Sequence, residues 1–115
     1  MESAPSGRVR VANEVIASIA SMAAREVDGV TGLDNSGAHH VADWLKRDVL
    51  HHGVRVMVDD DRGIHLDVFI SVRSGAVITQ VAERVQDNVI EAVERMLGLE
   101  VAETNVFVSG VSFEP

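Results

Sequence analysis

The chain has 115 residues, the length of one domain with its own hydrophobic core, and it has no cysteine, which excludes disulfide bonds and thiolate metal sites. Its formal net charge is −8, with 18 acidic against 10 basic residues and no cluster of Lys and Arg, which disfavours binding to nucleic acid or to an anionic membrane. No stretch reaches the roughly 18 apolar residues of a membrane span. We therefore expect a cytoplasmic protein without direct membrane insertion.

The N-terminal part predicts a leader, a strand and a helix. Residues 1–7 are small and polar, which is typical of a flexible leader, and residues 8–115 are expected to form a single domain. Residues 8–11 alternate between Arg and Val and predict a short strand. Asn13 is expected to cap a helix that ends near Gly29. Its apolar face comprises Val15, Ile16, Ile19, Ala20, Ala23 and Val27.

Residues 31–52 carry the weakest pattern and predict a variable connection. Residues 34–37 (Asp-Asn-Ser-Gly) have the chemistry of a turn. Apolar residues within 39–50 recur at helical spacing, so a short helix is one interpretation and an irregular connection is the other.

The strongest alternation of apolar and polar residues lies in 54–73. It predicts a β-hairpin whose two strands are joined by a turn at residues 59–63. The second strand places Ile64, Leu66, Val68, Ile70 and Val72 on one face and His65, Asp67, Phe69, Ser71 and Arg73 on the other. One face is therefore expected to be buried.

The C-terminal part predicts a long helix and a returning strand. Apolar residues at steps of three and four run from Ile78 to Met96, and Gly98 is expected to end the helix. Residues 106–108 then predict a strand. The fold class expected is α+β, a two-layer sandwich with the order strand-helix-strand-strand-helix-strand and two helices on one face of a small sheet.

Three apolar side chains are candidates for a partner-binding surface. Alternation places Met57, Phe69 and Phe107 on the sheet face opposite the helices, and an exposed apolar patch commonly marks an interface. A second small layer formed by residues 39–50 is the alternative cover for this face. Strand edges and the small residues of 17–24 are further surfaces for self-association.

The five histidines and the carboxylates do not predict a metal site or an active site. The histidines occur as His39, His40, His51, His52 and His65, and adjacent histidines lack the i, i+4 spacing that a helical zinc site needs. We expect them to be ordinary exposed residues. No nucleophile motif, phosphate-binding loop or dinucleotide fingerprint is present, so no catalytic residue, metal or cofactor is predicted.

Nearly the whole chain outside residues 31–52 resembles the alkaline-shock-protein family, which serves the envelope stress response of Gram-positive bacteria. The matching segments are GRVRV at 7–11, EVDGV at 26–30, GVRV at 53–56, LDVFISV at 66–72, VAERVQ at 81–86, MLGLEV at 96–101 and NVFVSGVSF at 105–113. The chain departs from the family at Ala12, where a serine that caps the helix is common, and Asn13 is a candidate substitute.

The resemblance implies a non-enzymatic scaffold or adaptor that forms oligomers and associates with the membrane through small integral-membrane partners. It carries over no active-site position. The function expected is therefore a cytoplasmic protein that self-associates and binds a protein partner near the membrane. The alternatives are a regulatory module that binds a soluble metabolic enzyme and a metal-binding protein that uses the histidines.

Overall fold

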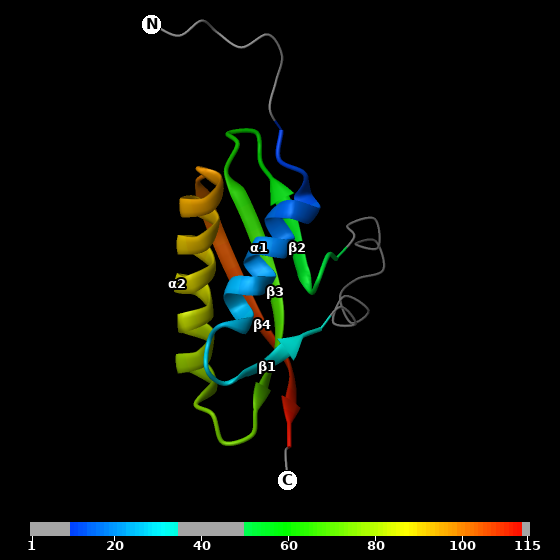
Figure 1. Ribbon diagram of the computed structural model, residues 1–115, viewed down its shortest axis with the longest axis vertical. Coiled ribbons are helices and arrows are strands. Elements are labelled where there is room, and N and C mark those ends of the chain that lie inside the picture. The colour runs from blue at the N-terminus through cyan, green and yellow to red at the C-terminus, as the bar shows by residue number, and fades with distance from the viewer. Residues whose placement is uncertain (1–9, 35–49, 114–115) are drawn as a thin grey trace, which may run out of the picture.

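The computed structural model describes residues 10–34 and 50–113 of the chain. In this part the elements are α1 (Asn13–Arg25), β1 (Val30–Leu33), β2 (Val54–Val58), β3 (Ile64–Arg73), α2 (Ile78–Leu97) and β4 (Val101–Ser112). Both helices lie on the same face of the sheet, as Figure 1 shows. The predicted two-layer α+β class is confirmed.

The sheet is built around β3, which pairs with all three other strands. β2 pairs antiparallel with residues 64–68 and β1 pairs antiparallel with residues 70–72, so these two strands share one edge of β3 end to end. β4 pairs parallel with β3 from Ile64 to Arg73 along the other edge. A parallel pair needs a crossover connection, and α2 supplies it. The predicted hairpin of residues 54–73 is confirmed as β2 and β3.

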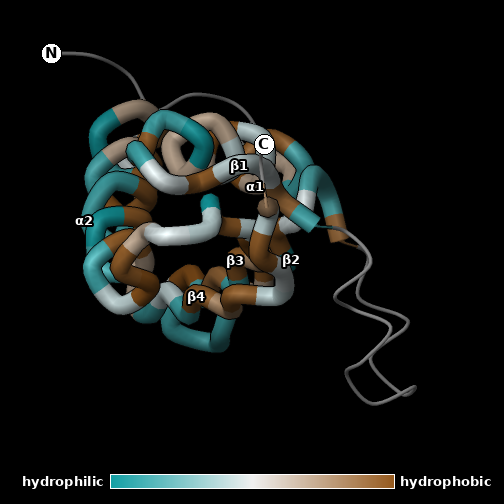
Figure 2. The backbone as a smooth tube through the Cα atoms, turned by 90° about the horizontal axis from the view of Figure 1, so that it is seen from below, coloured by the Kyte–Doolittle hydropathy of each residue, from teal (hydrophilic) through white to brown (hydrophobic). Residues whose placement is uncertain are grey.

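The core lies between the helices and the sheet. From α1, the alanines at 17, 20 and 24 are fully buried, and their small side chains allow the helix to lie close to its neighbours. From α2, a row of valines at 81, 85, 89 and 93 faces the sheet. Figure 2 shows this division, with the hydrophobic part of α2 turned inward and its hydrophilic part turned to solvent.

The predicted first strand is wrong in its placement. Arg10 and Val11 are not in a strand, and residues 8 and 9 lie outside the described residues. The first strand instead follows α1, as β1, because Val30, Gly32 and Leu33 pair with the end of β3. Over residues 10–34 and 50–113, the element order is therefore helix-strand-strand-strand-helix-strand.

The predicted end of α2 is confirmed, whereas the predicted capping residue of α1 is wrong. Gly98 ends α2 in the left-handed conformation, at φ 66°, as predicted. The residue that caps α1 is Ala12, without a side-chain hydrogen bond, and Asn13 is the first helical residue.

β4 is longer than the predicted strand at 106–108, because its whole length pairs with β3. The predicted leader and the possible helix within 39–50 lie outside the described residues, apart from Leu50, which is not helical.

Candidate interaction surface on the open sheet face

The face of the sheet opposite the helices is called the open face here. The register of β2, β3 and β4 arranges its side chains in rows that cross the strands. The first row is Met57, His65 and Glu103, the second is Arg55, Asp67 and Asn105, and the third is Phe69 and Phe107. Alternation along one strand shows which of its side chains share a face, but only the register between strands shows which residues share a row.

The third row is an aromatic pair. The rings of Phe69 and Phe107 stack with centroids 4.9 Å apart and an angle of 16° between their planes. Phe69 is 6% exposed, whereas Phe107 is 45% exposed. The backbone N–H of Phe69 donates to the Gly53 carbonyl, and its carbonyl accepts from the N–H of Asp34. Phe69 is thus a packing residue, and Phe107 presents the apolar surface.

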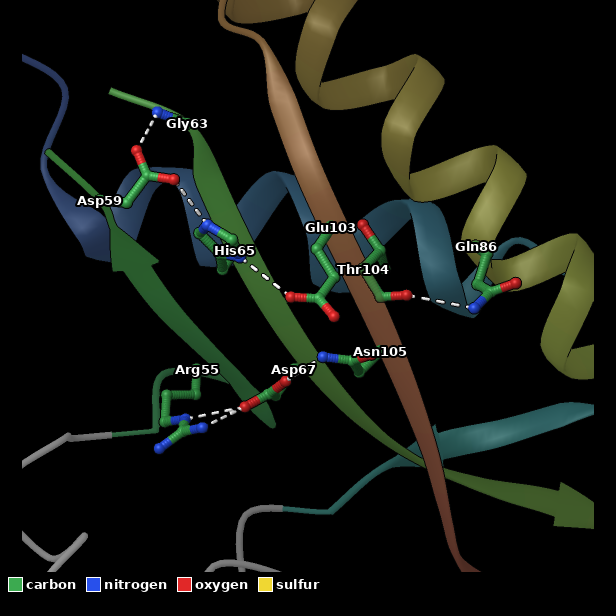
Figure 3. Close-up of polar contacts among 9 residues, drawn as sticks. All are labelled: Arg55, Asp59, Gly63, His65, Asp67, Gln86, Glu103, Thr104 and Asn105. Carbon is green, nitrogen blue, oxygen red and sulfur yellow. Dashed lines mark hydrogen bonds and ion pairs between the residues drawn. The ribbon is translucent and has the colours of Figure 1, made fainter. Parts of the chain in front are cut away.

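The second row is a polar cluster that fixes three strands to one another. Asp67, only 6% exposed, accepts hydrogen bonds from the guanidinium of Arg55, one of them 2.9 Å from Nε to Oδ2. The amide of Asn105 donates to the other carboxylate oxygen at 3.1 Å. Figure 3 shows Arg55, Asp67 and Asn105 reaching one another from β2, β3 and β4. The carboxylate is therefore satisfied by its neighbours, as a buried charge must be.

The first row places His65 between two carboxylates. Its Nε2 lies 2.8 Å from Oδ2 of Asp59, and its Nδ1 lies 3.0 Å from Oε1 of Glu103 (Figure 3). These hydrogen bonds raise the pKa of His65 above its ordinary value of 6.5, and the bond to Asp59 has the larger effect. The bond to His65 and those from the Gly63 and Asp61 amides lower the pKa of Asp59 below 3.8.

The three predicted partner-binding residues share the open face without forming one patch. Phe69 and Phe107 are in contact. Met57, 40% exposed, pairs with His65, which is four residues before Phe69 on β3. At about 3.3 Å per residue, Met57 lies about 13 Å along the strand from the aromatic pair, with the polar cluster between them.

Two other predicted surfaces turn out differently. The small residues of 17–24 are not available as a second binding face, because most of them, Ser21 included, are buried in the domain's own core. The edge of β2 is open beyond a single bridge between His51 and Val54 in the described part of the chain. The predicted edge at residues 8–11 falls partly outside the described residues and forms no strand in the rest.

The sequence did not reveal the pairing of His65. Its place on the polar face of a strand was readable, but Glu103 is 38 residues away and reaches it only through the register of β3 and β4.

His51 and His52 lie in the turn before β2, while His39 and His40 lie outside the described residues. Across residues 10–34 and 50–113, no group of three His, Asp or Glu side chains is arranged to hold a metal ion. Neither described helix is long and apolar enough to cross a membrane.

Solved structures share the fold of this chain. Two variants of the MamM CTD superpose with TM-scores of 0.51 and 0.50, at 17% and 18% sequence identity. These superpositions cover 90% and 89% of this chain and 100% and 96% of the MamM chains. At that identity, the likeness concerns the fold alone.

Sequence relatives are closer. YqhY of Bacillus subtilis is 38% identical over 109 residues, which is 94% of this chain and 79% of YqhY. YloU of the same organism is 34% identical over 107 residues, which is 91% of this chain and 88% of YloU. The sequence model of a family described as having a cell envelope-related function matches residues 1–113. The chain therefore belongs to this family, the alkaline shock protein 23 family, in agreement with the resemblance of its segments.

Proposed function

We propose that this protein is a non-enzymatic cytoplasmic scaffold or adaptor that self-associates and binds a protein partner near the membrane, with Phe107 at the centre of the contact. The family's cell envelope-related function supports this role. The observation that carries the proposal is the aromatic pair. Phe107 is half exposed on a sheet face that neither described helix covers, and it is held in place from below by Phe69.

The position of Phe107 on β4 supports self-association in particular. In the described part of the chain, β4 hydrogen-bonds to β3 and has no strand on its other edge. Its twelve residues contain neither proline nor lysine, the residues that commonly protect such an edge from pairing. A second copy that adds its own β4 would extend the sheet and bring Phe107 of each copy toward the same side.

Met57 is proposed as a peripheral contact rather than as part of the same patch. It is exposed on the open face but separated from Phe107 by the polar cluster. Phe69 is proposed to act by supporting Phe107. A charge at Phe69 would unfold the protein, because the side chain is buried, so Phe107 is the position at which the surface can be tested without loss of the fold.

The test is light scattering coupled to size exclusion, across protein concentration, on the wild type and on Phe107→Glu. We expect the wild type to form a concentration-dependent oligomer and the variant to dissociate at least tenfold more readily, because a charge replaces a desolvated apolar contact. Met96→Glu is the matched control, since Met96 is 54% exposed on α2 and lies on the helical side of the molecule. Equal association of the two variants would contradict the proposed face.

A pull-down from membrane and soluble fractions separates the adaptor from the regulatory alternative. The proposal predicts a membrane-protein partner that Phe107→Glu loses and Met96→Glu keeps. Capture of a soluble metabolic enzyme in its place would replace the proposal with the regulatory function.

A further inference from the structure

A cavity of about 650 Å³ lies at one end of the molecule, away from the open face. Its lining residues come mainly from the start of α1 and from the turn between β2 and β3, two segments at the upper end of the molecule in Figure 1. Its lining consists of Arg10, Val11, Ile16, Val58, Arg62, Ile64 and Leu99. The volume is within the range of small-molecule sites, and the lining combines an apolar floor with two cations.

Both arginines lack an ion-pair partner within residues 10–34 and 50–113. This is unusual in a chain of net charge −8, where carboxylates outnumber cations. Glu14, Asp60 and Asp61 are close in sequence to the lining, but none of them lines the cavity. The N-terminal end of α1 adds the positive end of its dipole to the same region.

The backbone of Arg62 gives a second, independent indication. Arg62 has φ 68°, in the left-handed region that an L residue other than Asn or Asp seldom adopts. The next residue is Gly63, so the turn places its glycine one position after the residue that needs it. Backbone strain of this kind clusters at ligand-binding sites, and Arg62 is among the residues that line the cavity.

We propose that this cavity binds a medium-chain fatty acid, with Arg10 and Arg62 holding its carboxylate and the apolar floor holding its chain. A guanidinium pairs with a carboxylate through two parallel hydrogen bonds, which fixes the head group at the mouth. Val58 is exposed and Val11 and Leu99 are half-buried, so these three side chains offer the ligand's chain apolar contact, over a base formed by buried Ile16 and Ile64. A free fatty acid fits better than a lipid in a bilayer, because the net charge of −8 opposes approach to an anionic membrane.

The test is calorimetric titration of the whole chain with laurate, compared with caprylate and with dodecanol. We expect one saturable site for laurate and about fourfold weaker binding for each CH₂ group removed, which corresponds to the free energy of burying that group. Dodecanol, which has no charge, should bind at least tenfold more weakly than laurate. Equal binding of laurate and dodecanol, or no binding of laurate, would overturn the proposal.

Arg62→Gly separates binding from folding. The substitution relaxes the left-handed backbone, so we expect the melting temperature to stay equal or to rise, while laurate binding falls at least tenfold. Val58→Glu is a second variant, because Val58 is 54% exposed at the cavity and a carboxylate there should repel the ligand. Arg95→Gln removes an exposed arginine on α2 and should leave binding unchanged.

Two further results decide between this site and its rivals. Phe107→Glu should bind laurate as the wild type does, because the open face and the cavity are separate. Binding to phosphatidylglycerol vesicles that depends on Arg62, with no binding of free laurate, would identify a bilayer lipid as the ligand and overturn the proposal. Laurate binding that persists in both Arg62→Gly and Val58→Glu would place the ligand elsewhere.

Discussion

At the scale of single residues, His65 links two separate parts of the fold at the open face. It joins the turn before β3, through Asp59, to β4, through Glu103. A protonated imidazole donates to both carboxylates, whereas a neutral one donates to only one of them. The protonation of one residue therefore decides whether both contacts are hydrogen bonds.

The pH dependence of stability follows from the two shifted pKa values. The raised pKa of His65 means that its contribution is complete below 6.5 and is lost as pH rises through the pKa in the folded state. The lowered pKa of Asp59 means that its contribution is present above 3.8 and is lost as pH falls through the pKa in the folded state. Both contributions are complete only between these two ordinary values.

We expect His65→Gln to lower the melting temperature by a few degrees at about pH 5.5, where the imidazole is protonated, and by less at about pH 9, where it is neutral. The effect is small at both pH values because solvent screens this exposed cluster. Thermal unfolding of both proteins across pH measures this difference. His52→Gln is the control, since His52 is exposed in the turn before β2 and makes no such pair of contacts in the described structure. A difference between wild type and His65→Gln that grows toward alkaline pH would contradict the assignment.

The face of each candidate residue was predictable, but its row was not. Alternation along β3 correctly placed Phe69 and Asp67 opposite Leu66 and Val68. Whether Phe69 stacks on Phe107 or lies beside Met57 depends on the register between strands that are distant in sequence. No local pattern contains that register, and burial of Phe69 follows from it.

At the scale of elements, the junction of β1 and β2 leaves no room for a side chain at residue 53. Gly53 has φ 82°, and a Cβ there would lie 2.6 Å from the Cβ of Leu33 and 3.1 Å from the backbone nitrogen of Asp34. Only glycine lets the end of β1 and the start of β2 meet beside Phe69.

We expect Gly53→Ala to destabilise the protein by about 3 kcal/mol, because backbone strain and steric overlap act together. Gly75→Ala is the matched control. Gly75 also has a positive φ, 91°, but nothing lies within 4 Å of its added Cβ, so the cost should be about 1 kcal/mol. Urea unfolding of the three proteins measures both values. Equal costs would show that the contact with Leu33 and Asp34 is unimportant.

The elements that the sequence predicted well are those with a long periodic pattern. α2 and β3 each carry an unbroken apolar stripe, and both were predicted close to their observed extent. β1 has four residues, too few to establish a period, and was missed. β4 was predicted only at 106–108, because Glu103 and Asn105 lower the local β propensity and the pairing with β3 overrides it.

At the scale of the whole molecule, the net charge opposes the self-association that the open face favours. Two copies of net charge −8 repel each other at long range, and dissolved salt screens that repulsion. We expect the dissociation constant of the oligomer to fall a few-fold from low to high ionic strength. Light scattering at several salt concentrations measures it, and Phe107→Glu serves as the control that stays dissociated. Weaker association at high salt would indicate an interface held by ion pairs.

The two-layer class was predictable at this scale because two amphipathic helices and a one-sided hairpin can bury their apolar faces only against each other. The order of the first two elements was not, since the alternation at 8–11 is too short to outweigh the pairing of β1 with β3. The cavity with Arg10 and Arg62 depends on residues from distant parts of the chain and left no local signal.

The end-to-end arrangement of β1 and β2 also has a consequence for how this chain can change in length. Phe69 accepts from Asp34 and donates to Gly53, so the chain leaves the sheet and returns to it at one residue of β3. The sheet therefore sets no length for the segment between these two points. In general, doubling the length of a connection costs only about 0.6 kcal/mol of loop-closure entropy, so we expect insertions between Asp34 and Gly53 to leave the fold stable.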